Sequence, residues 1–192
     1  MSKVDLSVNI GSLTLRNPIM LASGTVGYGN EMAEFTDLNK LGGIVTKSLS
    51  LKPRKGNPPQ RIVETPAGML NAIGLANVGV EVFLKEKIPF LKQFDVPLIC
   101  NIAASTIEEY VECTKILTEE ETIKAFEINV SCPNVKEGGL SFGNDLNSVA
   151  MITQKVREAT DKPIIIKLSP NVSYIAEFAK AAKERVRTVK NW

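Results

Sequence analysis

A single cysteine stands where an apolar run ends, in the stretch FEINVSCPNVKEGG at residues 126–139. The chain has no CxxC pair and no histidine at all. A Ser-His or Cys-His dyad and an imidazole metal ligand are therefore excluded. Any acid–base chemistry must come from Cys, Lys, Tyr, Asp or Glu, and Cys132 is one of the few groups available for it.

The other two cysteines, Cys100 and Cys113, are expected to be structural thiols. Three well-separated cysteines are typical of reduced thiols in a cytoplasmic protein and not of a disulfide framework. The N-terminal stretch lacks the apolar core of a secretion signal, and no apolar run approaches the ~18–20 residues that span a membrane. A net charge of +2 does not indicate the strongly basic surface that binds nucleic acid or membranes, so neither is expected as a partner.

Five short apolar runs, rich in β-branched residues, are predicted to be parallel strands buried on both faces. Helical patterns at 106–117, with Ser105 and Glu108 as a capping box, and at 145–159 lie between them. Strands that alternate with helices form a parallel sheet, and both a doubly wound sheet and a (β/α)₈ TIM barrel fit. The predicted strands are 18–23, 42–48, 97–103, 125–131 and 163–169.

The carboxyl end of each predicted strand carries polar residues, and this favours the barrel, whose active sites are assembled on that rim. Any one such residue can be an ordinary strand-end hydrogen bond or helix cap, but five strand ends together indicate a site. Five strands are fewer than the eight of a complete barrel. Residues 4–17 are expected to form a hairpin that covers the barrel, and 49–80 an elaborated loop over the rim. The polar residues are Ser23, Lys47, Ser48, Asn101, Asn129, Cys132 and Lys167.

Several motifs, in order and with sensible spacing, together resemble one enzyme family. They are TKS (46–48), NAIGLAN (71–77), CNIAAS (100–105), NVSCPNVKEGGLSFG (129–143) and IIIKLSPN (164–171). The chain resembles the dihydroorotate dehydrogenases from about residue 3 to about residue 183, and most of all the catalytic subunit of the NAD-linked class 1B form. The resemblance implies an FMN-containing (β/α)₈ barrel that oxidises dihydroorotate to orotate in pyrimidine (UMP) biosynthesis.

The resemblance also implies a role for each matching residue. Cys132 would remove the proton from C5 of the substrate while a hydride passes from C6 to flavin N5; a thiol with an ordinary pKa near ~8.5 can do this without histidine. Asparagine amides suit a planar pyrimidine because each offers a donor and an acceptor. Substrate binding is assigned to Lys47, Asn71, Ala72, Ile73, Gly74, Leu75, Asn129 and Asn134. FMN binding is assigned to Ser23, Lys47, Ser48, Asn101, Asn129 and Lys167; no metal site is predicted.

In the family, a partner subunit with FAD and a 2Fe-2S iron–sulfur cluster passes electrons to NAD, in a heterotetramer of two catalytic and two electron-transfer subunits. The present sequence has no glycine-rich dinucleotide fingerprint after a strand and no cysteine cluster for iron–sulfur binding. Direct NAD reduction by this chain is therefore not expected.

The resemblance stops after Glu184, so residues 1–184 are interpreted as the N-terminal part of one FMN-binding barrel domain and 185–192 as an aberrant tail. The family pattern leads one to expect Ala-Gly-Ala-Asp at this point, which the codons GCG GGT GCG GAC would encode. If the first G is deleted, the same bases are translated as Arg-Val-Arg-Thr, and residues 185–188 are RVRT. A frameshift is thus hypothesised. Without the remaining strands, the chain by itself is expected to fold poorly, to bind FMN weakly and to show negligible activity.

Three other interpretations stay open. A related FMN-dependent dihydropyrimidine dehydrogenase would use Asn71, Asn129 and Cys132 in the same way. A non-catalytic remnant would bind no flavin, and flavin absorbance of the purified protein separates it from the enzymes. A thiol acyl-transferase is remote because Cys132 has no histidine to activate it.

Replacing the assigned base gives the first prediction. In a protein with the complete barrel, Cys132→Ala should block dihydroorotate oxidation and leave the fold intact, because only the proton acceptor is lost. Cys132→Ser should keep a trace of activity at high pH, since a hydroxyl is a poorer base. Steady-state turnover checks this, and unchanged turnover of the alanine variant would exclude the assigned role.

Overall fold

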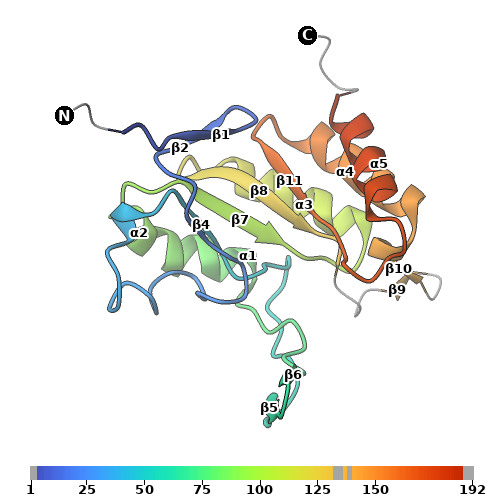
Figure 1. Ribbon diagram of the computed structural model, residues 1–192, viewed down its shortest axis with the longest axis horizontal. Coiled ribbons are helices and arrows are strands. Elements are labelled where there is room, and N and C mark those ends of the chain that lie inside the picture. Colours follow the sequence, from blue (N-terminus) through green and yellow to red (C-terminus); the bar gives the residue numbers. More distant parts are fainter. Residues whose placement is uncertain (1–3, 132–135, 138–139, 188–192) are drawn as a thin grey trace.

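The computed structural model describes residues 4–131, 136–137 and 140–187, and it is built around one five-stranded parallel sheet (Figure 1). The strands of this sheet are β3 (Met20–Leu21), β4 (Gly43–Val45), β7 (Leu98–Ile102), β8 (Ile123–Asn129) and β11 (Ile164–Lys167). All five lie inside or within two residues of the predicted apolar runs, so the predicted strands are confirmed.

Helices connect successive strands. A continuous helical segment joins β4 to β7, one helix joins β7 to β8, one joins β8 to β11, and one follows β11. They are α1 (Gly79–Val82) with the π-helical turn η2 (Phe83–Lys87) and α2 (Ile88–Leu91), then α3 (Ile107–Thr118), α4 (Leu146–Ala159) and α5 (Ile175–Arg187). Short 3₁₀ turns occur at η1 (Leu38–Lys40) and η3 (Phe142–Asn144).

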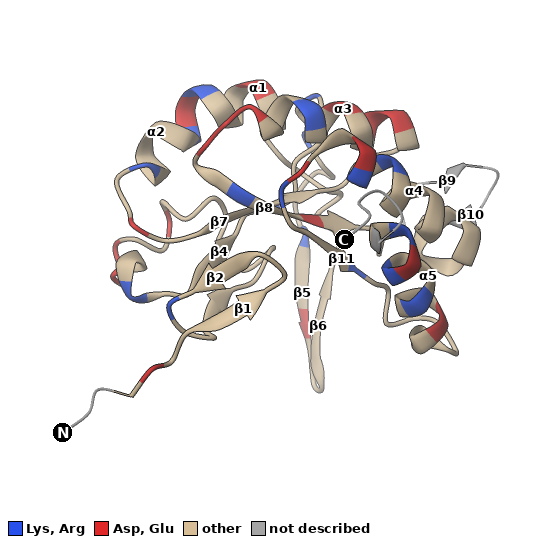
Figure 2. Ribbon diagram, turned by 90° about the horizontal axis from the view of Figure 1, so that it is seen from above, with Lys and Arg blue, Asp and Glu red and all other residues tan. Residues whose placement is uncertain are grey.

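The order of the strands distinguishes the two architectures that fit the sequence. The strands lie in chain order, β3-β4-β7-β8-β11, and every neighbouring pair is parallel. A doubly wound sheet reverses its strand order at a switch point and carries helices on both faces. In Figure 2 the helices form one arc outside the curved sheet. The chain is therefore a partial (β/α)₈ barrel of five βα units.

The outer face of the sheet carries the main hydrophobic core. Alternate strand residues such as Ile44, Cys100 and Phe126 point outward and pack with helix residues that include Phe83 and Ile152. Period-two alternation assigns one face of each strand to the helices. Burial of each large apolar side chain contributes ~1.5–3 kcal/mol to this packing.

The inner face starts with a smaller apolar layer of Val45, Ile99 and Ala125, packed with Ile165 and with Leu13. Leu13 belongs to the antiparallel hairpin of β1 (Val8–Ile10) and β2 (Leu13–Leu15), whose two-residue turn has Gly11 at φ 59°. The predicted N-terminal hairpin is thus confirmed. It covers the inner layer at the end of the barrel opposite to the carboxyl ends of the strands (Figure 1).

Two details of the sequence-based prediction were wrong. The cap of α3 is Thr106, whose hydroxyl accepts from the Glu109 amide at 3.1 Å, so the pair predicted as Ser105 and Glu108 is displaced by one residue. The segment 49–80 is not only a loop, because it contains the hairpin of β5 (Ile62–Thr65) and β6 (Gly68–Asn71) and the start of α1.

A further pair of strands, β9 (Lys136–Glu137) with β10 (Leu140–Ser141), follows β8.

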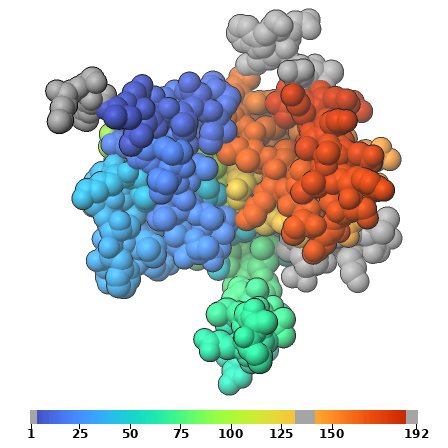
Figure 3. Space-filling model, in the orientation of Figure 1, coloured from blue at the N-terminus to red at the C-terminus, as the bar shows by residue number. Residues whose placement is uncertain are grey.

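The β5–β6 hairpin projects away from the body of the molecule (Figures 1 and 3) and is fastened at its base. Arg54 and Asn77 exchange two backbone hydrogen bonds of 2.9 Å. The buried Asn77 side chain accepts from the amides of Ser50 and Gly79 and donates to the Leu75 carbonyl. One amide side chain therefore closes the base of the segment that ends β6 and starts α1.

Strands β3 and β11 are the edges of the described sheet, and both carry apolar side chains that are only partly covered. Met20 is 36% exposed, and Ile164–Lys167 are half-buried. Unpaired strand edges promote association between molecules.

The predicted domain boundary after residue 184 and the frameshift hypothesis stay predictions. Helix α5 itself continues to Arg187.

The network at the base of the hairpin gives the second prediction. Asn77→Ala removes the acceptor for two backbone amides, so the free energy of unfolding should fall by about 1–3 kcal/mol. Urea denaturation followed by circular dichroism measures this change. Asn147→Ala, at an exposed position of α4, is the matched control and should change the free energy of unfolding by less than about 0.5 kcal/mol. An Asn77→Ala variant as stable as the control would contradict the anchoring role.

Candidate active site at the carboxyl ends of the strands

The carboxyl ends of the strands and the base of the β5–β6 hairpin enclose a cavity of about 830 Å³. Two smaller grooves, of about 510 and 600 Å³, lie along the outer helices and contain none of the predicted site residues. The residues that line the large cavity are Gly24, Lys47, Ser48, Asn57, Ile62, Met69, Asn71, Ala72, Ile73, Gly74, Leu75, Ala76, Asn129, Ser131 and Lys167.

Strand alternation explains why polar side chains face this cavity. Along each inner face, an apolar residue is followed two positions later by a polar one: Ile99 by Asn101, Ala125 by Glu127, and Ile165 by Lys167. The side-chain period of a strand is two, so the inner apolar layer forces its successors onto the same face. The polar layer therefore lies directly beyond the apolar layer, at the rim.

Lys47 and Ser48 follow β4 and are half-buried in the cavity wall. The Lys47 amide donates to the Gly27 carbonyl at 2.7 Å, which ties this rim segment to the loop after β3. Ser23 lies in that loop, half-buried, next to the cavity-lining Gly24. Ser23 itself is not part of the cavity wall, and its assigned role stays a prediction.

Asn129 ends β8, and its amide has a fixed orientation. Asn129 Oδ1 accepts from the Ser131 hydroxyl at 2.6 Å and from the Ser131 amide at 3.2 Å. The Asn129 carbonyl accepts from the Tyr110 hydroxyl at 2.7 Å. With its oxygen engaged, Asn129 offers the Nδ2 end of the amide, a hydrogen-bond donor, to a ligand.

Asn101, on the central strand β7, is fully buried and is not among the residues that line the cavity. Its Nδ2 donates to Glu127 Oε1 at 2.5 Å, and Glu127 Oε1 lies 3.8 Å from Lys167 Nζ. Asn101 Oδ1 is buried and has no hydrogen-bond partner among the described residues. Neither Glu127 nor Ser131 was predicted as a site residue. The alternation Ala125-Glu127-Asn129 was the signal that could have identified Glu127.

The predicted residues Asn71, Ala72, Ile73, Gly74 and Leu75 all lie on the cavity, where β6 ends. Cross-strand pairing places Ile62 opposite Asn71 and Met69 opposite Glu64, so Ile62, Met69 and Asn71 share the hairpin face that lines the cavity. Ile62, which was not predicted, and Met69 add an exposed apolar wall.

The chain turns sharply after this hairpin. Gly74 has φ 72° and Leu75 has φ 56°, a left-handed conformation that non-glycine residues seldom adopt. A Cβ atom at Gly74 would lie 2.7 Å from the Asn57 amide nitrogen, so only glycine fits. Such conformations persist where the surrounding structure enforces them, and they cluster at functional sites.

Cys132 and Asn134 lie outside the described residues, so their predicted roles stay predictions. The other two cysteines are buried on the helix-covered side of the sheet, away from the cavity. Burial raises the pKa of the Cys100 thiol far above its usual range and raises the pKa of Cys113 to about 12. Both are therefore neutral thiols at physiological pH, as expected for structural cysteines.

Two ammonium groups, Lys47 and Lys167, give the described cavity wall its positive charge. Within 4–131, 136–137 and 140–187, no group of three or more Cys, Asp or Glu side chains could hold a metal ion. The helices of that part of the chain include none long and apolar enough to cross a membrane.

The sequence was compared with known protein families. The family model for dihydroorotate dehydrogenase matches residues 5–190. The chain belongs to the dihydroorotate dehydrogenase family. The resemblance inferred from the motifs is thereby confirmed.

Several relatives are named dihydroorotate dehydrogenase B (NAD(+)), catalytic subunit. Those of Geotalea uraniireducens and Geotalea daltonii are 52% and 54% identical to the chain over 94% of its length, and that of Geobacter sulfurreducens is 53% identical over 96%. The chain spans 59–60% of the length of these relatives. The crystal structure of DHODH from Eimeria tenella in complex with ferulenol shares the fold at TM-score 0.74 and 21% identity, over 94% of this chain and 57% of that one.

The third prediction concerns the thiols. In folded protein at pH 8, iodoacetamide should leave Cys100 and Cys113 almost unmodified, because burial excludes the reagent and raises both thiol pKa values. Peptide mapping by mass spectrometry measures the extent of labelling. The same protein in denaturant is the control and should be alkylated at both positions. Rapid alkylation of either cysteine in the folded state would contradict the assignment.

Proposed function

We propose that this chain forms the substrate and flavin-ring side of an NAD-linked dihydroorotate dehydrogenase, which oxidises (S)-dihydroorotate to orotate in pyrimidine biosynthesis. The observation that carries the proposal is the convergence of Lys47, Asn71, Asn129 and Lys167 on one cavity at the carboxyl rim. Membership of the family and the name of the relatives support it.

The residues of the rim suit an isoalloxazine ring, the redox-active part of FMN. Its pyrimidine end offers an N–H donor between two carbonyl acceptors. The rim offers a donor on Asn129, the Lys167 ammonium, and Asn101 Oδ1, an acceptor without a partner among the described residues. A cation at this position would favour the anionic reduced flavin. In barrels of this class the phosphate is bound after strands seven and eight, whereas this chain spans the first five.

Lys47 favours a substrate that carries a carboxylate. Its ammonium on the cavity wall suits the carboxylate of dihydroorotate through a charged hydrogen bond. Asn71 and Asn129 would hold the pyrimidine ring, and the turn at Gly74–Leu75 would close beside it. A dihydropyrimidine without the carboxylate would leave Lys47 unpaired, so the related dihydropyrimidine dehydrogenase is the less suitable alternative.

Within this site Cys132 would accept the C5 proton on one side of the substrate. Bound FMN would supply the hydride acceptor for C6 on the other side. Asn71 and Asn129 would keep the ring between these two groups, and Lys47 would fix it through its carboxylate. The partner proposed for electron transfer to NAD is a second subunit with FAD and a 2Fe-2S cluster, since this sequence contains neither binding motif.

One experiment compares the 192-residue chain with the same chain extended by the C-terminal part of the Geobacter sulfurreducens relative. The extended protein should bind FMN and oxidise dihydroorotate with an artificial acceptor, whereas the shorter chain should bind FMN weakly and show negligible turnover. Orotate absorbance reports the reaction. An extended protein that binds FMN but prefers dihydrouracil would support the alternative, and one that binds no flavin would refute both.

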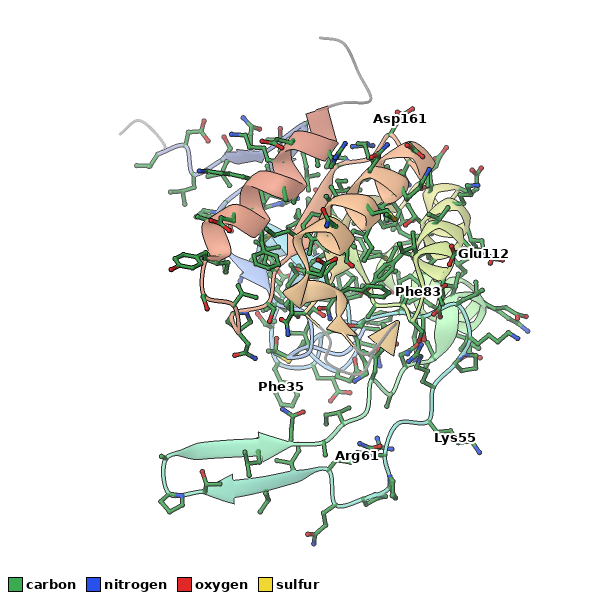
Figure 4. All side chains as sticks on the ribbon, turned by 90° about the vertical axis from the view of Figure 1, so that its right-hand side faces the viewer. Phe35, Lys55, Arg61, Phe83, Glu112 and Asp161 are labelled. Atoms are coloured by element: carbon green, nitrogen blue, oxygen red, sulfur yellow. The ribbon has the colours of Figure 1, made fainter. Side chains whose placement is uncertain are left out.

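The fourth prediction tests the shared cation. In the extended protein, Lys47→Ala should weaken both orotate and FMN binding tenfold or more, because loss of a charged hydrogen bond costs about 1.5–3 kcal/mol. Flavin fluorescence and orotate titration measure the two affinities. Lys55→Ala, at an exposed position outside the cavity (Figure 4), is the matched control. Orotate affinity within about twofold of the parent protein would argue against the role of Lys47.

A further inference from the structure

Glu127 lies in the middle of β8, on the inner face of the sheet, between two strands that carry predicted ligand-binding residues. It pairs directly with Asn101 on β7 and with Ile165 on β11, two residues before Lys167. Its side chain is only 15% exposed. A buried carboxylate requires partners. Glu127 finds them in the Asn101 amide at 2.5 Å and the Lys167 ammonium at 3.8 Å.

The carboxylate determines which way the Asn101 amide points. An ionised carboxylate only accepts hydrogen bonds, so it pairs with the NH₂ end of Asn101 and would repel the carbonyl end. The flipped amide would face Glu127 with Oδ1 and lose the 2.5 Å bond. Glu127 thus leaves Oδ1 as the remaining polar atom of this side chain.

That remaining acceptor, Asn101 Oδ1, is buried and has no hydrogen-bond partner in the part of the chain that the structure describes. Leaving a buried acceptor unpaired is costly, and buried polar groups are paired in the great majority of cases. A ligand that donates an N–H group would satisfy it.

Lys167 is constrained by the same carboxylate. Its side chain is 40% exposed, yet its ammonium stays within 3.8 Å of Glu127. A long flexible side chain loses rotamer freedom when a ligand fixes it, and a partner that fixes it beforehand reduces this loss. The carboxylate therefore holds the Lys167 ammonium at the end of β11, on the side of β8 opposite to β7.

We propose that Glu127 is a positioning residue: it orients the Asn101 amide so that an acceptor is left for a ligand N–H, and it holds the Lys167 ammonium at the end of the strand on the other side of β8. The ligand class that fits is a planar ring with an N–H donor next to a carbonyl oxygen, as at the pyrimidine end of a flavin. The identity of this ligand as FMN rests on the proposed function. The orientation of Asn101 and Lys167 by Glu127 does not.

The first measurement needs no ligand. In the NMR spectrum of the flavin-free 192-residue chain, one side-chain NH₂ proton of Asn101 should lie downfield of the corresponding proton of the exposed Asn147, because its acceptor is charged. Glu127→Gln keeps the size of the side chain and removes the charge, so this proton should move upfield. Glu112→Gln on the outer surface of α3 (Figure 4) is the matched control and should leave it in place.

The second measurement is a double-mutant cycle in the extended protein, in which flavin fluorescence measures the affinity for FMN. Glu127→Gln should weaken FMN binding roughly threefold to tenfold, since the ion pair is partly exposed and screened. Lys167→Met should weaken it as well, and the double variant should lose less affinity than the sum of the two single losses, because Glu127 acts in part through Lys167. Thermal unfolding of the flavin-free variants separates this effect from a loss of stability.

The outcomes are distinguishable. An unchanged Asn101 signal in Glu127→Gln, or strictly additive losses in the cycle, would overturn the inference. If Glu127→Gln does not fold, the chemical shift of the Asn101 side-chain proton in the parent chain tests the inference. A chemical shift equal to that of the Asn147 side-chain proton would overturn it. If the extended protein binds no FMN, the flavin assignment fails, while the Asn101 signal still tests the positioning role.

Discussion

Side chains alternate between the two faces of a β-strand, and in this protein helices cover one of those faces along the central strands. Residues such as Ile44, Cys100 and Phe126 are committed to the helix-covered core, so their neighbours in the sequence must face the barrel interior. Parallel strands bring all their carboxyl ends to one edge. The polar residue after each inner apolar residue then arrives at the same rim. The cavity, its charges and its hydrogen bonds all depend on this single constraint.

The inner polar layer shows how the rim is organised once it is formed. Asn129 is oriented by Ser131 and Asn101 by Glu127, so that adjacent strands present amides of opposite polarity, one a donor and one an acceptor. A planar heterocycle has the same alternation of donors and acceptors along its edge. Binding specificity thus depends on residues behind the ligand-facing side chains as much as on those side chains themselves.

Local sequence patterns identified the five strands, the helices α3 and α4, the N-terminal hairpin and four cavity-lining residues at strand ends, and the family resemblance added residues 71–75 of the cavity wall. These features follow from period-two and period-3.6 burial and from motifs that are short in sequence. The β5–β6 hairpin was not predicted, because its strands pair with each other in an exposed arm and lack a buried, apolar face. Glu127 was missed because an isolated acidic residue in a strand says nothing of its partners, which come from β7 and β11. The cap of α3 was displaced because both Ser105 and Thr106 are good capping residues. The structure selects Thr106, while Glu109 accepts from the Ser105 amide and pairs with the distant Arg54.

The most direct test of the central claim is to map FMN binding on isotope-labelled protein by amide chemical shifts, at ligand concentrations high enough to reveal weak binding. The structure predicts shifts at Lys47, Asn101, Asn129 and Lys167 on the rim, and none in the β1–β2 hairpin at the opposite end of the barrel or in the grooves between the outer helices. Shifts confined to the outer grooves, or no shifts at all from a folded chain, would contradict the assignment of the rim as the flavin site.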